Sequence, residues 1–183
     1  MDNGASSYRR YLNGDEEAFR EIVAHYADPL IFFIDRYIHD IAAAEDIALD
    51  VFTDLVVNRH RYHFQVSLKT YLFMLGRSRA LDHIRHRNKL QMLPLEQAFS
   101  LPLDEPSLEE KLLEDARKQA VHQALKQLPR QLQEAVHLVY FEQLSCKEAA
   151  KVMKKTTKQV YNLLYRGKQA LRAVLGKEGE QLL

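Results

Sequence analysis

Apolar residues recur at helical spacing along most of the chain. Between residues 15 and 39 they form two groups on either side of Pro29, which are Phe19, Ile22, Val23 and Tyr26, then Leu30, Phe33, Ile34, Tyr37 and Ile38. Proline removes a backbone donor, so we expect Pro29 to separate or kink two helices. Residues 43–57 continue the period, and Ser67 is a suitable N-cap for a long helix through Ile84. The pattern predicts an all-α fold.

Two stretches break this period. Residues 58–66 mix basic and aromatic side chains without a clear repeat, and residues 90–107 contain three prolines. We interpret the second stretch as a flexible linker. The predicted organisation is therefore two small helical domains, residues 1–92 and 115–183, joined by a linker over 93–114.

The C-terminal part predicts several short helices. Pro129 suits the first helical position of one of them. Ser145 with Glu148, and Thr156 with Gln159, each match a capping box. The first capped helix has room for fewer than two turns before the second begins. Two capped helices so close together indicate a helix-turn-helix. The second helix carries one apolar stripe, formed by Val160, Leu163, Leu164, Gly167, Leu171, Val174 and Leu175.

The face opposite this stripe carries side chains that can bind DNA bases. It comprises Thr157, Lys158, Gln159, Tyr161, Asn162, Tyr165 and Arg166. In a helix-turn-helix the second helix lies in the major groove, where Asn and Gln bind adenine and Arg or Lys binds guanine. Lys154, Lys155 and Lys168 surround this face and suit phosphates. A helical hairpin with a merely basic face is the alternative.

Charge is unevenly distributed, although the net charge is only +1. Residues 14–57 hold eleven acidic and two basic side chains, whereas residues 58–91 hold eight basic and one acidic. Residues 149–177 hold eight basic side chains and no acidic one. Two basic blocks suggest two contacts with a polyanion. The acidic block is either a solvated face or the site of a basic protein partner.

The first basic block interleaves cations with aromatic rings. Its candidate binding residues are Arg59, Arg61, Tyr62, Phe64, Lys69 and Tyr71. Aromatic faces stack on unpaired bases while cations follow the backbone, which is how proteins bind single strands. The alternative is that Phe64 and Tyr71 are core residues.

Composition excludes several other classes. Of 183 residues, 46% are apolar and 28% charged, which is typical of a folded soluble protein. No apolar run reaches the roughly 18 residues of a membrane span, and no secretory signal is expected, so we predict a cytoplasmic protein. One cysteine, Cys146, excludes an internal disulfide; a redox role for it is a minor alternative. Six glycines and the lack of catalytic motifs predict that the protein is not an enzyme and needs no cofactor.

Histidines occur as two pairs, His60 with His63 and His83 with His86. Four imidazoles could hold zinc, but these lie in a strongly basic block where a dication is unfavourable. We therefore predict no metal site.

The order and spacing of motifs along the chain resemble those of the sigma-70 family of bacterial RNA polymerase sigma factors, in its short extracytoplasmic-function (ECF) group. The matching motifs lie at residues 18–19, 44–47, 50–52, 67–73, 79–85, 125–129 and 144–150, then at Val160, Leu164, Arg166, Leu171 and Arg172. The resemblance implies two helical domains, a core RNA polymerase partner and promoter DNA. It further implies a free monomer, no membrane insertion, and control by an anti-sigma factor.

The resemblance also implies a role for each group of residues. The surface that docks on the polymerase corresponds to Asp46, Asp50, Phe52 and Asp54. The loop 58–66 and the start of the next helix correspond to the part that captures unpaired bases of the −10 element. Arg79, Asp82 and Arg85 correspond to its upstream edge, and the second domain to the reader of the −35 element.

The chain departs from the family pattern at a few positions. The family often has Trp where Tyr71 stands and Asn where Ser78 stands. The family usually has Gly in the turn where Lys154 stands, so the turn geometry of this chain can differ from that of the family. Gly167 replaces the usual alanine and is expected to weaken the second helix by up to about 1 kcal/mol.

Two other functions fit parts of this sequence. A self-contained helix-turn-helix regulator would dimerise to bind paired half-sites, and an RNA-binding adaptor would use the block 58–91. A sensor domain has no need of a basic aromatic loop, and an adaptor leaves the capped helix pair unexplained. We therefore expect a promoter-specificity factor that supports strand opening.

Overall fold

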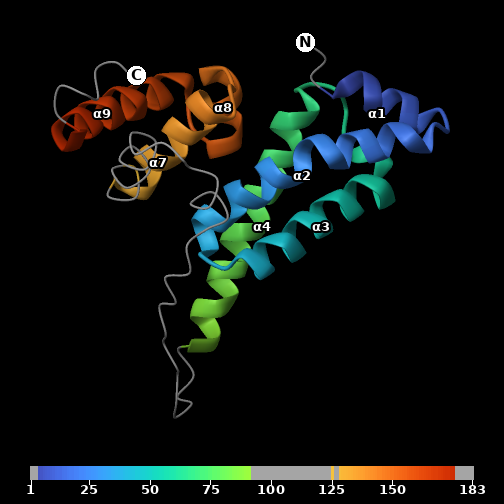
Figure 1. Cartoon of the computed structure of the whole chain (residues 1–183), viewed down its shortest axis with the longest axis horizontal. Helices are drawn as coiled ribbons and strands as arrows, with labels where there is room; N and C mark the ends of the chain where they lie inside the picture. The colour runs from blue at the N-terminus through green and yellow to red at the C-terminus, as the bar shows by residue number, and fades with distance from the viewer. Residues whose placement is uncertain (1–3, 92–124, 126–127, 176–183) are drawn as a thin grey trace. The chain divides into compact units, whose positions relative to one another are not determined.

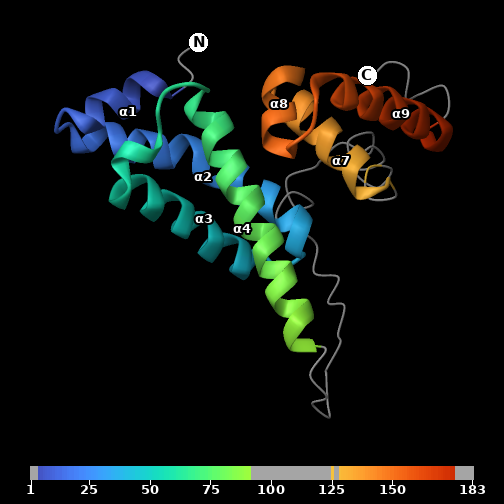
Figure 2. The same cartoon turned by 180° about the vertical axis from the view of Figure 1, so that it is seen from behind.

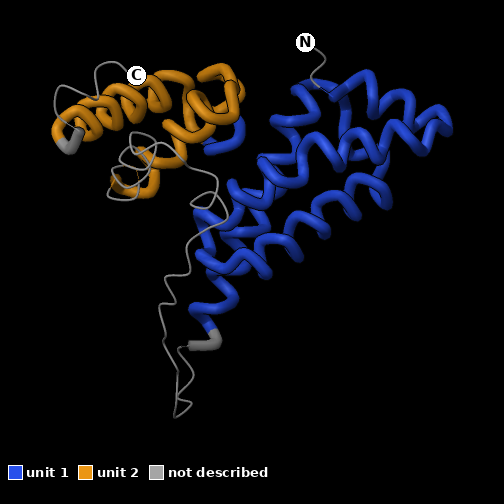
Figure 3. Tube along the Cα trace, in the orientation of Figure 1, with its two compact units in different colours: residues 1–95, 151–154 blue, residues 96–150, 155–183 orange. Residues whose placement is uncertain are grey.

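The computed structural model describes residues 4–91, 125 and 128–175, with the side chains of residues 4–89, 125 and 128–173. All regular elements in these ranges are helical, which confirms the predicted fold class. The chain divides into two compact units, residues 1–95 with 151–154 and residues 96–150 with 155–183 (Figure 3). The predicted linker, residues 93–114, lies outside the described residues.

Four helices and one short turn make up the N-terminal unit. They are α1 (Ala5–Leu12), α2 (Glu16–Ile38), α3 (Ile41–Val57), the 3₁₀ turn η1 (Arg59–Arg61) and α4 (Leu68–Gln91). Helices α2, α3 and α4 pack against one another, and α1 packs on α2 (Figures 1 and 2). The largest fully buried side chains of this core are Tyr8, Phe33, Phe73, Ile22, Leu30, Ile34, Leu55, Leu68, Leu72 and Val51.

Helix α2 runs through Pro29 without a break, so the expected separation into two helices is wrong. An internal proline costs about 3 kcal/mol because it removes one backbone hydrogen bond. On either side of it, Tyr26, Leu30 and Phe33 are each no more than 4% exposed. Full burial of such a side chain gains roughly 1.5–3 kcal/mol. The packing of this face therefore outweighs the cost of the proline.

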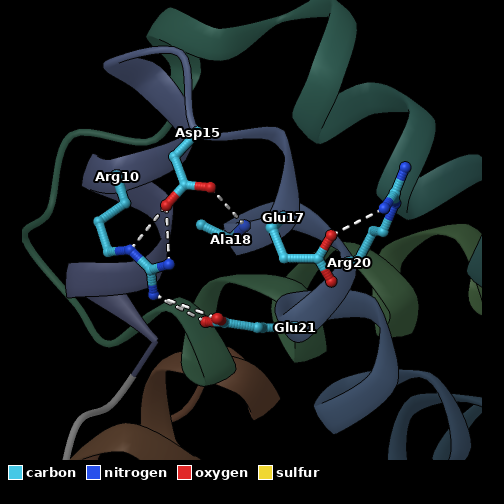
Figure 4. Close-up of polar contacts among 6 residues, drawn as sticks. All are labelled: Arg10, Asp15, Glu17, Ala18, Arg20 and Glu21. Atoms are coloured by element: carbon cyan, nitrogen blue, oxygen red, sulfur yellow. Dashed lines mark hydrogen bonds and ion pairs between the residues drawn. The ribbon is translucent and has the colours of Figure 1, made fainter.

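Helix α1 is an element that the apolar pattern did not predict. It has only eight residues, and its buried side chains are Tyr8 and Tyr11. Beyond it, the Asp15 carboxylate caps α2 by accepting a hydrogen bond from Ala18 N at 3.3 Å. The Arg10 guanidinium joins α1 to this cap through Asp15 and to α2 through Glu21 (Figure 4). The bond from Arg10 holds the pKa of Asp15 below its usual value.

The described residues of the C-terminal unit are also mainly helical. Helix α7 (Arg130–Val136) continues into a π-helical turn, η2 (His137–Phe141), and α8 (Cys146–Met153) and α9 (Thr157–Leu175) follow. Pro129 is the N-cap residue of α7, one position before the predicted one. Leu132, Leu138, Val160 and Leu171 are each at most 5% exposed and form part of its core.

Gly167 lies on the side of α9 that faces α7. A Cβ atom at this position would be 2.9 Å from Val136 Cγ2, which is shorter than a van der Waals contact. Val136 is 1% exposed and β-branched, so its methyl group has little room to move. The glycine therefore lets the two helices approach, and this offsets its low helix propensity.

We expect Gly167→Ala to lower the stability of the C-terminal unit by about 1 kcal/mol. The overpacking penalty of roughly 1–3 kcal/mol exceeds the propensity gain of up to about 1 kcal/mol. Hydrogen exchange of the α7 and α9 amides in the full chain measures this locally. In a Val136→Ala background, where the methyl group is gone, the same substitution should instead be neutral or stabilising. Stabilisation in both backgrounds would contradict the close approach.

Candidate nucleic-acid interfaces

The two predicted capping boxes are both present. At the start of α8, Glu148 N donates to Ser145 Oγ at 3.3 Å and Ser145 N donates to Glu148 Oε2 at 3.0 Å. At the start of α9, Gln159 N donates to Thr156 Oγ1 at 3.2 Å and Thr156 N donates to Gln159 Oε1 at 2.8 Å. These bonds satisfy amides that a helix start leaves unpaired. They confirm the two helix starts expected from sequence.

The exposed face of α9 is the one predicted. Val160, Leu163, Leu164 and Leu171 are at most 9% exposed. The side chains exposed on the other side are Lys158, Gln159, Tyr161, Asn162, Tyr165 and Arg166, while Thr157 is half-buried. Tyr161 and Tyr165 are 59% and 66% exposed, which is unusual for large rings without a partner surface.

Gln159 has a different task from the base contact assigned to it. Its Oε1 atom accepts the Thr156 amide in the capping box. A bidentate contact with adenine needs both the oxygen and the nitrogen of an amide side chain. Asn162 is exposed on the same face and makes no hydrogen bond among the described side chains. Asn162 is therefore the better candidate for adenine.

The turn between α8 and α9 adopts the left-handed geometry that glycine favours. Lys154 has φ +53°, Lys155 N donates to Ala150 O at 2.9 Å, and Lys154 N donates to Lys151 O at 3.3 Å. Together they form a Schellman motif with Lys154 in the position where glycine is usual. The lysine keeps the turn and carries the strain of a positive φ.

We expect Lys154→Gly to raise the stability of this helix pair by roughly 0.5–1 kcal/mol, because glycine removes the left-handed strain. Lys154→Ala removes the charge but keeps the strain, and should bring no such gain. Urea unfolding of both variants tests this. If Lys154 also contacts a phosphate, both variants should make the log–log salt dependence of DNA binding shallower by about 0.9. A less stable Gly variant would contradict the strain at this turn.

The three lysines assigned to phosphates differ in their surroundings. Lys154 is exposed, whereas Lys155 and Lys168 are half-buried. The Lys168 Nζ atom lies 5.1 Å from the centroid of the Tyr140 ring, in a cation–π contact. A phosphate that binds Lys168 would therefore compete with the Tyr140 ring for its ammonium group.

Tyr62 is placed differently from its predicted role on an open stacking surface. It is 3% exposed, and its hydroxyl donates to Val66 O at 2.7 Å. Burial raises the pKa of Tyr62 to about 12, so the hydroxyl keeps its proton. Tyr62 holds the loop 58–66 in shape, and this corrects its assignment as a base-stacking residue.

Phe64 and Tyr71 are half-buried, and both rings contact the ring of Tyr62. Their ring centroids are 4.7 Å and 5.0 Å from that of Tyr62. Phe64 has φ +58°, a left-handed conformation that is rare for a bulky residue. Strained residues are often found at binding sites, where the surrounding structure holds them. Of the two loop residues assigned to base stacking, Phe64 is thus the less buried one.

Asp54 binds the basic residues of the loop and of α4. Its Oδ1 atom accepts from Asn58 Nδ2 at 2.6 Å and lies 3.4 Å from Arg61 Nη1 and 3.8 Å from Arg79 Nη2. Only 11% of the Asp54 side chain is exposed. This corrects its placement on a polymerase-docking surface: it links the loop to α4 instead. Arg61 and Arg79, assigned to the −10 element, meet this carboxylate in the free protein.

The other side chains assigned to the −10 element lie along α4 or before it. The Arg59 guanidinium carbon lies 4.9 Å from the Tyr11 ring centroid, and Lys69 Nζ lies 5.6 Å from that of Phe73. Asp82 and Arg85 form an exposed ion pair on the outside of α4. Of these cations, Arg59 and Arg85 are the exposed ones.

Helix α3 carries the predicted acidic surface. Asp46 and Asp50 are exposed, whereas Phe52 is 6% exposed and belongs to the core, which corrects its placement on that surface. Leu49 and Val57, each 67% exposed, were not singled out from the sequence. The sequence did contain a sign of them, because the apolar residues of this helix extend beyond the face that packs in the core.

Within the described ranges, no group of three or more His, Cys, Asp or Glu residues could hold a metal ion. No helix there is long and apolar enough to cross a bilayer. Cys146 is a free, half-buried cysteine at the start of α8.

Comparison with known families places both units. Residues 22–90 match the model of sigma-70 region 2, and residues 118–171 match that of sigma-70 region 4. The chain belongs to the sigma-70 family. Similar curated proteins include the RNA polymerase sigma-H factor of Pseudomonas aeruginosa, which is 27% identical over 91% of this chain and 90% of the relative. The ECF RNA polymerase sigma factor SigW of Bacillus subtilis is also 27% identical, over 91% and 94%.

Solved structures agree with this sigma factor in fold. The sigma factor RpoE of Bartonella quintana, in complex with the anti-sigma factor NepR, covers 87% of this chain and 97% of its own, with a TM-score of 0.64 at 19% identity. CnrH, in complex with the cytosolic domain of CnrY, gives a TM-score of 0.65 at 18% identity, over 95% and 97%. The chain is thus an ECF sigma factor, a transcription initiation factor of two helical domains.

Proposed function

We propose that this ECF sigma factor binds core RNA polymerase, reads the −35 and −10 elements of a promoter and stabilises the opened strand. The observation that carries the proposal is that one chain has two different surfaces, each suited to DNA in a different state. One is the exposed polar face of a capped helix, which suits duplex DNA. The other is a strained aromatic residue in a basic loop, which suits an unpaired base.

At the −35 element, α9 lies in the major groove. Asn162 binds adenine and Arg166 binds guanine through paired hydrogen bonds. The rings of Tyr161 and Tyr165 offer apolar contacts, since both are largely exposed. Lys154 and its neighbours fix the register on phosphates, which carry affinity without base preference.

At the −10 element, the loop 58–66 captures a base that leaves the duplex. Phe64 supplies the stacking surface. Tyr62 supports it through a ring contact, and Asp54 holds the start of the loop through its bond from Asn58. Unstacking a base costs a few kcal/mol, and stacking on an aromatic ring returns about 1–3 kcal/mol per base. Stacking on a preformed loop therefore offsets the cost of unstacking the base, and the open strand is favoured without an external energy source.

The polymerase contact is assigned to α3. Asp46 and Asp50 supply negative charge, and Leu49 and Val57 supply apolar area on exposed positions of the helix. Such a surface suits a partner that is basic and partly apolar. Because the polymerase performs the chemistry, the sigma factor itself is not an enzyme, and it works in the cytoplasm where polymerase and promoter lie.

A protein partner that blocks these surfaces is also part of the proposal. Two of the similar solved structures are complexes, one with the anti-sigma factor NepR and one with the cytosolic domain of CnrY. An analogous anti-sigma factor would keep this chain from the polymerase until a signal releases it.

Size-exclusion chromatography with mass detection tests the proposal. The free chain should elute as a monomer and should join core polymerase in a 1:1 complex. A free dimer that binds duplex DNA and ignores the polymerase would instead establish the stand-alone regulator.

A further inference from the structure

Helix α1 lies outside the segment that matches sigma-70 region 2, which begins at residue 22. It nevertheless contacts the base-capturing loop directly. The Tyr8 hydroxyl donates to Leu55 O at 2.9 Å and lies 3.3 Å from Arg59 O. Tyr8 is fully buried, and burial raises its pKa to about 12, so this hydroxyl remains a donor. The helix is thereby held against the end of α3 and the start of the loop.

The next residue, Arg9, reaches the ring of Phe64. Its guanidinium carbon lies 4.8 Å from the ring centroid, and its side chain is exposed. The aromatic side chain that is available to a base therefore has a cation beside it, contributed by a different helix. Cations next to aromatic platforms are the arrangement that proteins use for single-stranded nucleic acids.

Two of the neighbouring cations are partly neutralised, whereas Arg9 is not. Arg10 on the same helix is bound to Asp15 and Glu21 (Figure 4). In the loop, Arg61 Nη1 lies 3.4 Å from Asp54 Oδ1. Arg9 forms no ion pair within the part of the chain that the structure describes. Its exposed guanidinium therefore carries an unpaired charge over the Phe64 ring.

We propose that Arg9 binds a phosphate of the unpaired strand next to the base that stacks on Phe64. This deepens the proposed function and rests on it: α1 becomes one wall of the base-capture site. The contact is electrostatic, so it should strengthen capture of any sequence without setting base preference. The structure also offers a contrary reading, in which Arg9 only covers the ring and has to leave before a base can stack.

Fluorescence anisotropy with the holoenzyme distinguishes these readings. The probe is a promoter fragment selected from random DNA by transcription with the holoenzyme, with its −10 segment left unpaired. Arg9→Gln keeps the length of the side chain and removes its charge, and Arg9→Lys keeps the charge. Arg10→Gln is the matched control, since it removes the same charge one position along α1.

Arg9→Gln should weaken binding about fivefold at low salt and make the log–log salt slope shallower by about 0.7, the value for one single-strand phosphate. Arg9→Lys should keep the slope of the parent, and Arg10→Gln should change neither quantity. Unchanged or tighter binding by Arg9→Gln would overturn the proposal, the latter showing that Arg9 is a cover. Failure of the parent holoenzyme to bind the probe would instead count against the proposed function itself.

Discussion

Replacing Arg166 with alanine is expected to lower promoter-directed transcription about tenfold to a hundredfold. The residue is exposed on the α9 face that is assigned to the −35 duplex. A lost bidentate contact with guanine costs about 1–3 kcal/mol and relaxes the preference for that base. Binding of core polymerase should not change. Run-off transcription measures the loss of activity, and selection of random −35 sequences by the variant holoenzyme measures the relaxed base preference.

Arg172→Ala is the matched control for this variant. Arg172 is also exposed on α9, but it lies outside the set assigned to bases. Its loss should weaken binding to all sequences by a similar, small factor without changing the selected −35 element. If Arg166→Ala lost polymerase binding, or kept the parental −35 preference, the assigned face of α9 would be wrong.

Charge reversal at Asp46 is expected to weaken binding to core polymerase by at least tenfold. Asp46 is exposed on α3 and forms no ion pair among the described residues, so Asp46→Lys should not unfold the chain. A like charge facing a basic partner costs several kcal/mol, whereas an exposed ion pair within a protein is worth at most about 1 kcal/mol. Titration of labelled core polymerase gives the affinity, and circular dichroism checks the fold.

Glu45→Lys makes the same charge change at the adjacent position. Glu45 is exposed as well, but it is rotated by about 100° around the helix from Asp46. Glu45→Lys should therefore lose much less affinity for core polymerase than Asp46→Lys. Equal losses from both variants would indicate a general effect of net charge and would contradict a docking surface centred on Asp46 and Asp50.

The helices were largely predictable because local chemistry determines them. The capping residues Ser67, Ser145 and Thr156 make the expected bonds. The described apolar side chains of the α9 stripe, Val160, Leu163, Leu164 and Leu171, are buried as their spacing required. Such signals act within one turn of helix, so a single sequence contains them completely. The same locality made the exposed face of α9 predictable.

Where the prediction failed, distant contacts decide the outcome. Pro29 does not break α2, because the residues around it are buried against other helices. Gly167 is placed by the methyl group of Val136, thirty-one positions earlier in the sequence. The period of a sequence contains no information about which helix faces which, so these outcomes required the fold.

The base-capture site shows the same division. The mixture of cations and rings in residues 58–66 was visible, but composition could not separate the buried Tyr62 from the strained Phe64. It also could not show that Asp54 neutralises part of this basic block, or that α1 contributes Arg9. Arg9 and Phe64 lie on different elements and far apart in sequence, and Asp54 meets Arg79 from another helix, so only the fold brings them together.

Permanganate footprinting during transcription tests the central claim most directly. Core polymerase with this chain should transcribe a selected promoter and should make thymines of its −10 segment reactive, which shows unpaired bases. Phe64→Ala should reduce this reactivity while the complex with polymerase persists. If the chain binds the polymerase and promoter but no thymine becomes reactive and no transcript forms, the account of strand capture by the loop 58–66 is wrong.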